Sequence, residues 1–252
     1  MKSRGADALL LAAGFLVCWQ GLFWLVGPDV VSSPWTTISR AAVLLRTQNF
    51  WKDASSTGIA FAYACIIGVL GGMVLGLLLG LNRFVGDVAD PILGTVYSIP
   101  KITLYPIILL IFGLSLAAKV AFGVIHGIFP VAIFTMSAVR NVAPVHRRTA
   151  KALRLSPVAT IITVLAPAAI PEILSGIRIG VAVTLLGILI AELFASSSGI
   201  GYALIRATDL HNVVDIFALT LLLFLFALAI NTLLHISERR AHHGADPSGE
   251  RS

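Results

Sequence analysis

The sequence has very little charge for its length. Only 12% of its 252 residues are Asp, Glu, Lys or Arg, whereas 58% are hydrophobic and the mean hydropathy is +0.94. A soluble domain of this size needs more charge to cover its surface. The composition therefore excludes an ordinary soluble protein and indicates an integral membrane protein.

Signatures of catalytic and nucleotide-binding sites are missing as well. The sequence has no G-x-x-x-x-G-K-[ST] motif, no Gly-Lys dipeptide, and no G-x-S-x-G, H-E-x-x-H or C-x-x-C. Its six histidines are scattered, and Cys18 and Cys65 each lie within an apolar segment, where small packing residues are common. We therefore expect no enzymatic activity, no metal and no cofactor in this chain.

Apolar segments long enough to cross a bilayer fill most of the sequence. About 30 Å of hydrocarbon takes roughly 20 helical residues, and lipid offers no partner to a backbone amide outside a helix. We predict an all-α integral membrane protein whose transmembrane domain, residues 1–236, precedes a polar, disordered tail at 237–252. The six predicted transmembrane helices are residues 6–26, 58–81, 92–112, 117–139, 173–195 and 214–236.

The distribution of basic residues predicts the orientation of these spans. With the N-terminus in the cytoplasm most Lys and Arg residues fall inside, and an even number of spans returns the C-terminus to the cytoplasm. The net charge of +6 therefore reflects topology and does not indicate nucleic-acid binding. The basic residues predicted to lie outside are Arg40, Arg46, Lys52, Lys119 and Arg206.

The connection at residues 140–167 is longer and more basic than the others, and reads RNVAPVHRRTAKALRLSPVATIITVLAP. Such a basic helix, held at the membrane surface and joined to spans on both sides, is suited to passing force from a soluble partner into the bilayer. We therefore interpret this segment as a cytoplasmic coupling region.

A row of glycines marks the second predicted span. Their four-residue spacing makes a smooth stripe that lets another helix approach closely. Packing within the subunit is the favoured interpretation, and a homodimer seam is the alternative. The glycines are Gly68, Gly72, Gly76 and Gly80.

The third predicted span contains two prolines, Pro100 and Pro106. Proline removes an amide donor and clashes with the preceding turn, so this helix must kink or partly unwind. Lys101 follows the first proline, and an intramembrane lysine must reach an interface or face a wet interior. A role in a translocation path and plain packing both remain open for this stretch.

Ionisable residues lie near both ends of the fifth predicted span. Glu192 precedes a run of small residues that includes Ser196. One interpretation is a gate or polar lining at the external mouth, and the other is that Glu192 simply lies at the water interface. Glu172 and Arg178 are six residues apart, so each needs a partner on another helix.

Taken together, these segments resemble the permease subunit of bacterial ABC importers in the nitrate, sulfonate and taurine group. The resemblance rests on SIPKITLYPIILLIFG, AKVAFGVIHGIFPVAIFTMSAVRNV, IPEILSGIRIG and AELFASSSGIGYAL, which occur in the order and at the spacing of that group. The cytoplasmic motif of such permeases is E-A-A, three residues, Gly, nine residues, I-x-L-P. Here Arg148 replaces its acid and Arg154 its glycine, while Ala150 and Pro167 are retained.

The resemblance implies a type I importer permease in contact with membrane lipid. It also implies three protein partners: cytoplasmic ATPases that hold ATP and Mg, an extracytoplasmic substrate-binding protein and a second copy of this chain. It places the protein in the bacterial inner membrane and implies a small anion, or a pyrimidine or vitamin precursor, as solute. Because arginine disfavours positive φ, we expect the coupling helix to run past Arg154 toward Pro157. The residues implied to contact the ATPase are Arg148, Thr149, Ala150, Lys151, Leu153, Arg154, Leu155 and Pro167.

Two other classes remain possible on the sequence. A stand-alone secondary transporter would need coupling residues of its own, for which Glu192 and Glu172 are the candidates, and it would work without ATP. A membrane scaffold would tolerate loss of Pro100, Lys101 and Glu192 but would still need the basic insert.

Overall fold

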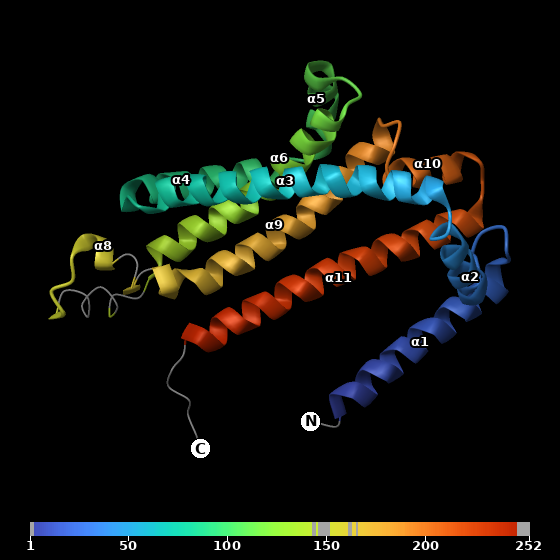
Figure 1. Cartoon of the computed structure of the whole chain (residues 1–252), viewed down its shortest axis with the longest axis horizontal. Helices are drawn as coiled ribbons and strands as arrows, with labels where there is room; N and C mark the ends of the chain where they lie inside the picture. The colour runs from blue at the N-terminus through green and yellow to red at the C-terminus, as the bar shows by residue number, and fades with distance from the viewer. Residues whose placement is uncertain (1–2, 143–144, 146–151, 161–162, 165, 246–252) are drawn as a thin grey trace. The chain divides into compact units, whose positions relative to one another are not determined.

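A computed structural model describes residues 3–142, 145, 152–160, 163–164 and 166–245 of the chain (Figure 1). Within these residues the regular secondary structure is helical, as the sequence predicts. The named helices are α1 Ser3–Val26, α2 Pro34–Leu44, α3 Gln48–Gly80, α4 Arg83–Ser98, the 3₁₀ helix η1 Lys101–Leu104, α5 Tyr105–Phe112, α6 Leu116–Arg140, α8 Pro157–Thr160, α9 Ala166–Phe194, α10 Ile200–Asp209 and α11 Val213–Ala245.

Helices of membrane-spanning length dominate the described part of the chain. Four of them, α3, α6, α9 and α11, are long and apolar enough to cross a bilayer, and α4 with η1 and α5 forms a fifth candidate that is bent by 80°. The first predicted span corresponds to α1, whose apolar part is the shorter helix Leu10–Val26. The prediction of a helical, multi-pass membrane protein is therefore confirmed.

The structure corrects three predicted boundaries. The third span is not one helix at residues 92–112: α4 begins at Arg83 and ends before Pro100, and η1 and α5 follow the bend. Helix α9 begins at Ala166, seven residues before the predicted start of its span. Helix α11 continues to Ala245, so the first part of the predicted disordered tail is helical.

The chain divides into two compact units, and the first comprises residues 1–57 and 192–226. Its core packs Ile200 and Ala207 of α10 against Leu219 of α11, with Leu44 and Phe50 beside them. Trp19 of α1 donates from Nε1 to the carbonyl of Ser32 at 2.9 Å and stacks on Phe217 of α11 at 6.0 Å between ring centroids. Short helices and apolar side chains thus build a local core within this unit.

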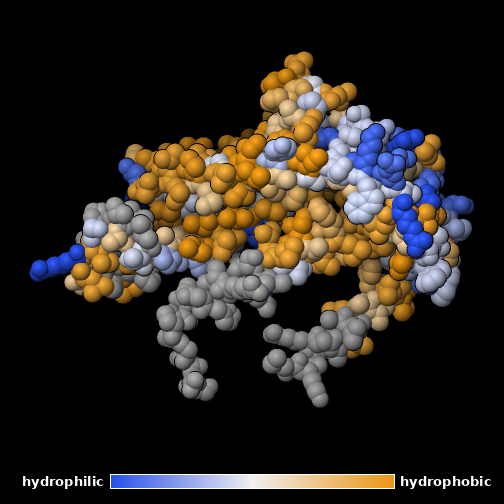
Figure 2. Space-filling model, in the orientation of Figure 1, coloured by the Kyte–Doolittle hydropathy of each residue, from blue (hydrophilic) through white to orange (hydrophobic). Residues whose placement is uncertain are grey.

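The second unit comprises residues 58–191 and 227–252. Its central helix, α6, is the most buried of the spanning helices, and small residues on α3 and α9 let both approach it closely (Figure 1). A Cβ on Gly180 of α9, for example, would lie 2.5 Å from Val131 of α6. Figure 2 shows apolar side chains over the visible surface of α4 and α5, as expected for helices that face lipid.

Candidate functional site

The broken span places a lysine inside an irregular stretch of backbone. Pro100 has extended backbone with ψ 97°, so the chain leaves α4 there, and Pro106 occupies an N-terminal position of α5, where its missing amide costs no hydrogen bond. The ammonium of Lys101 donates to the carbonyl of Tyr97 at 2.7 Å. It also lies 4.3 Å from the Tyr97 ring centroid and 6.0 Å from that of Phe129 on α6. Lys101 is thus partly buried and held by a carbonyl and two aromatic faces.

Polar groups that the sequence analysis did not assign to a site lie on one face of α6 or pack against it. The hydroxyl of Tyr105 donates to the carbonyl of Ala191 at 2.8 Å, and its ring packs against Phe122 at 4.8 Å between centroids. His126 bonds through Nδ1 to the carbonyl of Phe122 at 2.9 Å. Lys119, which the topology placed among the external cations, is only 5% exposed. Their signal in the sequence is the helical spacing of Lys119, Phe122 and His126, which puts them on one buried face.

Glu192 lies inside the protein. Its exposure is 0%, so the interpretation that it sits at the water interface is wrong. The hydroxyl of Thr57 on α3 lies 2.8 Å from Oε2 and 3.1 Å from Oε1 of Glu192, and the backbone amide of Gly201 donates to Oε2 at 3.0 Å. The carboxylate is thereby tied to α3 and α10, and it is not an open lining of a channel mouth.

The run of small residues after α9 forms a turn that hydrogen bonds hold in place. Three successive backbone amides at the start of α10 have side-chain acceptors: that of Gly199 donates to Asp53 at 2.9 Å, that of Ile200 to Thr57 at 2.8 Å, and that of Gly201 to Glu192. These acceptors satisfy amides that a helix start leaves without partners. Asp53 and Thr57, which the sequence analysis missed, are four residues apart and hence on one face of α3.

Ser196 takes part in this turn through local hydrogen bonds. Its hydroxyl donates to the carbonyl of Ser198 at 2.7 Å and accepts from the Ser198 amide at 3.2 Å. The Ser198 hydroxyl lies 2.9 Å from that of Ser56 on α3. Gly199 has φ +114°, a conformation that residues with a side chain rarely adopt. The predicted flexible gate is therefore a turn fixed on α3.

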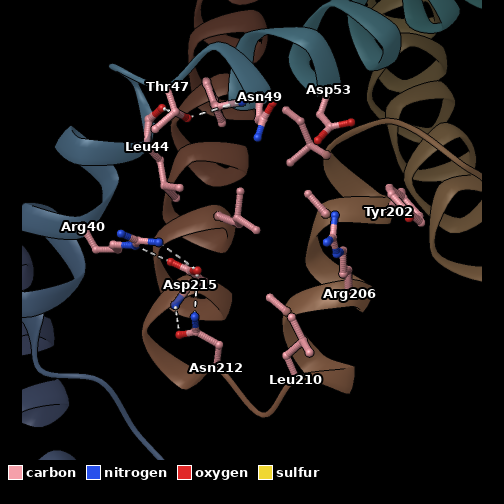
Figure 3. Close-up of a pocket in the computed structure, with 15 residues that line it drawn as sticks. Arg40, Leu44, Thr47, Asn49, Asp53, Tyr202, Arg206, Leu210, Asn212 and Asp215 are labelled. Atoms are coloured by element: carbon pink, nitrogen blue, oxygen red, sulfur yellow. Dashed lines mark hydrogen bonds and ion pairs between the residues drawn. The ribbon is translucent and has the colours of Figure 1, made fainter.

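A pocket of about 330 Å³ opens in the first unit between α2, the start of α3, α10 and the start of α11 (Figure 3). Arg40 of α2 forms a bidentate ion pair with Asp215 of α11, in which the Nη2–Oδ2 distance is 3.0 Å. Asn212 donates to the same carboxylate at 2.8 Å. The hydrogen bond with Asp215 raises the pKa of the Arg40 guanidinium, so Arg40 stays charged throughout the physiological range.

The glycine stripe lies against α6 of the same chain. Each of its four members is buried, and a Cβ on Gly72 or Gly76 would lie 2.8 or 2.5 Å from a backbone carbonyl oxygen of α6. The stripe is therefore filled by an intrachain helix contact, which agrees with the packing interpretation and not with a homodimer seam.

The coupling region is described in part. Arg148, Thr149, Ala150 and Lys151 lie outside the described residues. Leu153 is 64% exposed, Leu155 is partly exposed, and Pro167 is exposed in the first turn of α9. A turn includes Leu153 and Arg154, and Arg154 has φ +49°. The expectation that the helix runs past Arg154 is wrong, because the arginine adopts the left-handed conformation that suits the family's glycine.

Glu172 and Arg178, the charged residues near the start of the fifth predicted span, do not pair with each other. Arg178 lies 3.0 Å from Nδ1 of His235 on α11, measured from Nη1, so its partner is on another helix as the six-residue spacing requires. Glu172 is partly buried in the first turns of α9. Both residues belong to the second compact unit, whereas Glu192 belongs to the first.

Comparison with known proteins assigns the architecture. Residues 68–243 match the family described as the binding-protein-dependent transport system inner membrane component. The chain belongs to this family. A probable ABC transporter permease protein of Haemophilus influenzae is 30% identical over 93% of the chain and 98% of its own length. A putative aliphatic sulfonates transport permease of Bacillus subtilis is 27% identical over 92% and 85%, respectively.

Solved structures agree on the fold. A chain of the MetNI methionine ABC transporter, captured in inward-facing conformations, aligns with a TM-score of 0.60 at 18% identity, over 74% of this chain and 93% of its own length. The protein is therefore an all-α, multi-pass permease of the ABC importer class. Its relatives are transporter permeases and not enzymes.

Proposed function

We propose that this permease works as one of two copies that enclose a translocation path, with a cytoplasmic ATPase bound to each. An extracytoplasmic binding protein delivers the solute, and both termini of the permease face the cytoplasm. ATP and Mg are held by the ATPases. The observation that supports this proposal is the family match over residues 68–243, which includes the broken span and the whole of the basic insert.

The permease contributes two packings of its helices, and ATP binding selects between them. A ligand shifts such an equilibrium only through its different affinities for the two states, so no catalytic residue is required in this chain. Irregular backbone at membrane depth is tolerated only beside protein or a wet cavity, which supports a place for the broken span beside the translocation path. The exposed side chain of Leu153, next to the turn at Arg154, supports a contact with the ATPase.

A small anion is the proposed solute, with a pyrimidine or vitamin precursor as the alternative. The Bacillus relative is named for aliphatic sulfonates, and a 27% identical relative in Escherichia coli is named for taurine. Within this chain, Lys101 supports an anion because its ammonium lies at the break in the span.

Co-purification tests the proposed assembly. The tagged chain is extracted from native membranes, and its partners are identified by mass spectrometry. We expect an ATPase with a phosphate-binding loop and a binding protein. Leu153→Glu should abolish recovery of the ATPase, whereas Leu114→Glu, which changes an equally exposed leucine (71%) between α5 and α6, should retain it. Recovery of the chain alone, with uptake driven by protons or sodium, would replace the proposal with a secondary transporter.

A further inference from the structure

Arg140, the last residue of α6, is tied to α4 by two carboxylates. Its guanidinium pairs through Nη2 with Asp87, and its Nη1 lies 3.8 Å from Oδ2 of Asp90. The two acids are three residues apart and hence on one face of α4. Their side chains are more than half exposed, whereas that of Arg140 is only 19% exposed. The arginine is therefore lodged between the two helices, and the acids hold its charged end.

A glycine of α4 makes room for this arginine. Gly86 is buried, and an added Cβ there would lie 2.7 Å from Cδ and 3.0 Å from Nε of Arg140. One turn earlier, Asn82 caps the start of α4 by accepting from the amides of Phe84 at 3.0 Å and Val85 at 3.4 Å. The first turns of α4 are thus fixed on the end of α6 by packing as well as by charge.

The end of α6 is also where the basic insert, residues 140–167, joins the spanning helices. Val142 packs with Ala138 of α6 and with Ala169 in the first turn of α9, and Ile173 of α9 lies beside them. Val142, Ala138 and Ala169 are all buried. The insert therefore leaves α6 and enters α9 at one buried contact, and Arg140 lies between Ala138 and Val142 in the chain.

Helix α4 leads from this contact to the broken span. It ends at Ser98, and beyond Pro100 the chain turns by 80° into η1 and α5. The start of α5 is anchored separately, because the hydroxyl of Tyr105 donates to the carbonyl of Ala191 on α9. A displacement of α4 must then be taken up at the bend, since Pro100 interrupts the helical hydrogen bonds there.

We propose that Arg140 is a positioning residue for coupling: its contacts with Asp87 and Asp90 make the start of α4 follow the base of the basic insert. The inference rests on the proposed function, in which this side of the permease faces the cytoplasm and an ATPase moves the insert. Exposed ion pairs contribute little to stability, so these pairs serve to hold two helices in register. Movement of the insert then reaches the bend at Pro100 through α4.

Labelling of a cysteine at the bend tests this role in the nanodisc complex of permease and co-purified ATPase. Ile99→Cys introduces a target at a residue that is 45% exposed, and Cys18→Ser with Cys65→Ala removes the native thiols. The measurement is the change in maleimide-labelling rate caused by a non-hydrolysable ATP analogue with Mg. We expect the analogue to change this rate, and Arg140→Gln to reduce the change about threefold, as expected for a partly exposed ion pair.

Matched variants separate the ion pairs from a general effect of charge. Arg83→Gln removes the same charge from an exposed residue in the first turn of α4, which takes no part in these ion pairs, and should leave the response unchanged. Asp87→Asn combined with Asp90→Asn should act like Arg140→Gln. Joining both sides in one variant should add nothing further, because each side removes the same contact. Multiplied effects would show that the arginine and the acids act independently.

Assembly and stability are measured on the same samples. We expect Arg140→Gln to retain ATPase recovery and the thermal unfolding midpoint of the wild type. A wild-type labelling response in this variant would overturn the link, whether or not its midpoint falls. Loss of ATPase recovery would also overturn it by placing Arg140 in the ATPase contact. If the wild-type permease recovers no ATPase, the proposed function fails, whereas recovery without any response at the bend overturns only the link.

Discussion

The hydroxyl of Thr57 on α3 donates to the buried carboxylate of Glu192 on α9, and the same oxygen accepts from the backbone amide of Ile200 on α10. Three helices thus meet at one oxygen atom. The exposures of Thr57 and Glu192, 1% and 0%, leave no water to replace a lost partner at this point. The junction fixes where α10 begins and hence how the pocket beside α10 is formed.

Replacing Thr57 tests that junction. Thr57→Val keeps the shape but removes the hydroxyl, which leaves the Ile200 amide and the Glu192 carboxylate each short of a partner. We expect a loss of about 1–3 kcal/mol in the free energy of unfolding, seen as a lower midpoint in thermal unfolding of the solubilised protein. Thr57→Ser retains the hydroxyl and serves as the control. Equal midpoints for Val and Ser would show that the hydroxyl does not stabilise this junction.

Gly199 should tolerate no side chain. An added Cβ would lie 2.0 Å from Oε1 of Glu192, and the residue's φ of +114° strains any L side chain. Gly199→Ala should therefore lower the unfolding midpoint strongly, by several degrees or more. Gly94→Ala, in a helix with nothing within 4 Å of the added Cβ, should leave it unchanged or raise it slightly. A midpoint for Gly199→Ala like that of Gly94→Ala would contradict the geometry of the turn.

Replacing Gly76 or Gly71 of α3 by alanine should lower the stability of the protein by different amounts. A Cβ on Gly76 would lie 2.5 Å from the backbone oxygen of Ala132, which can yield only if the helices separate. We expect Gly76→Ala to cost about 1–3 kcal/mol in unfolding free energy through overpacking. On Gly71 the Cβ would meet the flexible end of Ile128 at 3.3 Å, so Gly71→Ala should cost much less. If Gly71→Ala lowered the thermal unfolding midpoint more than Gly76→Ala, the closest contact between α3 and α6 would not lie at Gly76.

Arg154 adopts a left-handed backbone conformation that glycine adopts without strain. Arg154→Gly and Arg154→Ala both remove the guanidinium, but only glycine relieves a strain of about 1 kcal/mol. We expect Arg154→Gly to bind the co-purified ATPase about fivefold more tightly than Arg154→Ala, measured by titration of the reconstituted permease. Equal affinities for the two variants would mean that this turn does not limit docking.

Much of the fold follows from apolar length alone. Lipid permits helices and leaves few alternatives, so the segments that became α3, α6, α9 and α11 were predictable. The prolines predicted a break in the third span, because proline blocks a helical hydrogen bond wherever it stands. The 80° size of the bend was not predictable, since packing against distant residues on α6 sets it.

The site residues were harder to predict because their partners are distant in the sequence. Glu192 reads as an interfacial acid until Thr57, 135 positions away, supplies its hydrogen bond. The left-handed turn at Arg154 ran against the ordinary preference of arginine, and the surrounding chain overrode that preference. Local sequence patterns therefore predicted the segments that contain the site residues. The partners of several of these residues depend on long-range contacts that the patterns do not show.

ATP-driven uptake by proteoliposomes distinguishes an ABC importer from a secondary transporter. The permease is reconstituted with its co-purified ATPase, and the binding protein and labelled solute are added outside. We predict uptake that requires ATP on the ATPase side and the binding protein on the other side, and that survives collapse of proton and sodium gradients by ionophores. Uptake by the permease alone that disappears with those gradients would instead show a secondary transporter.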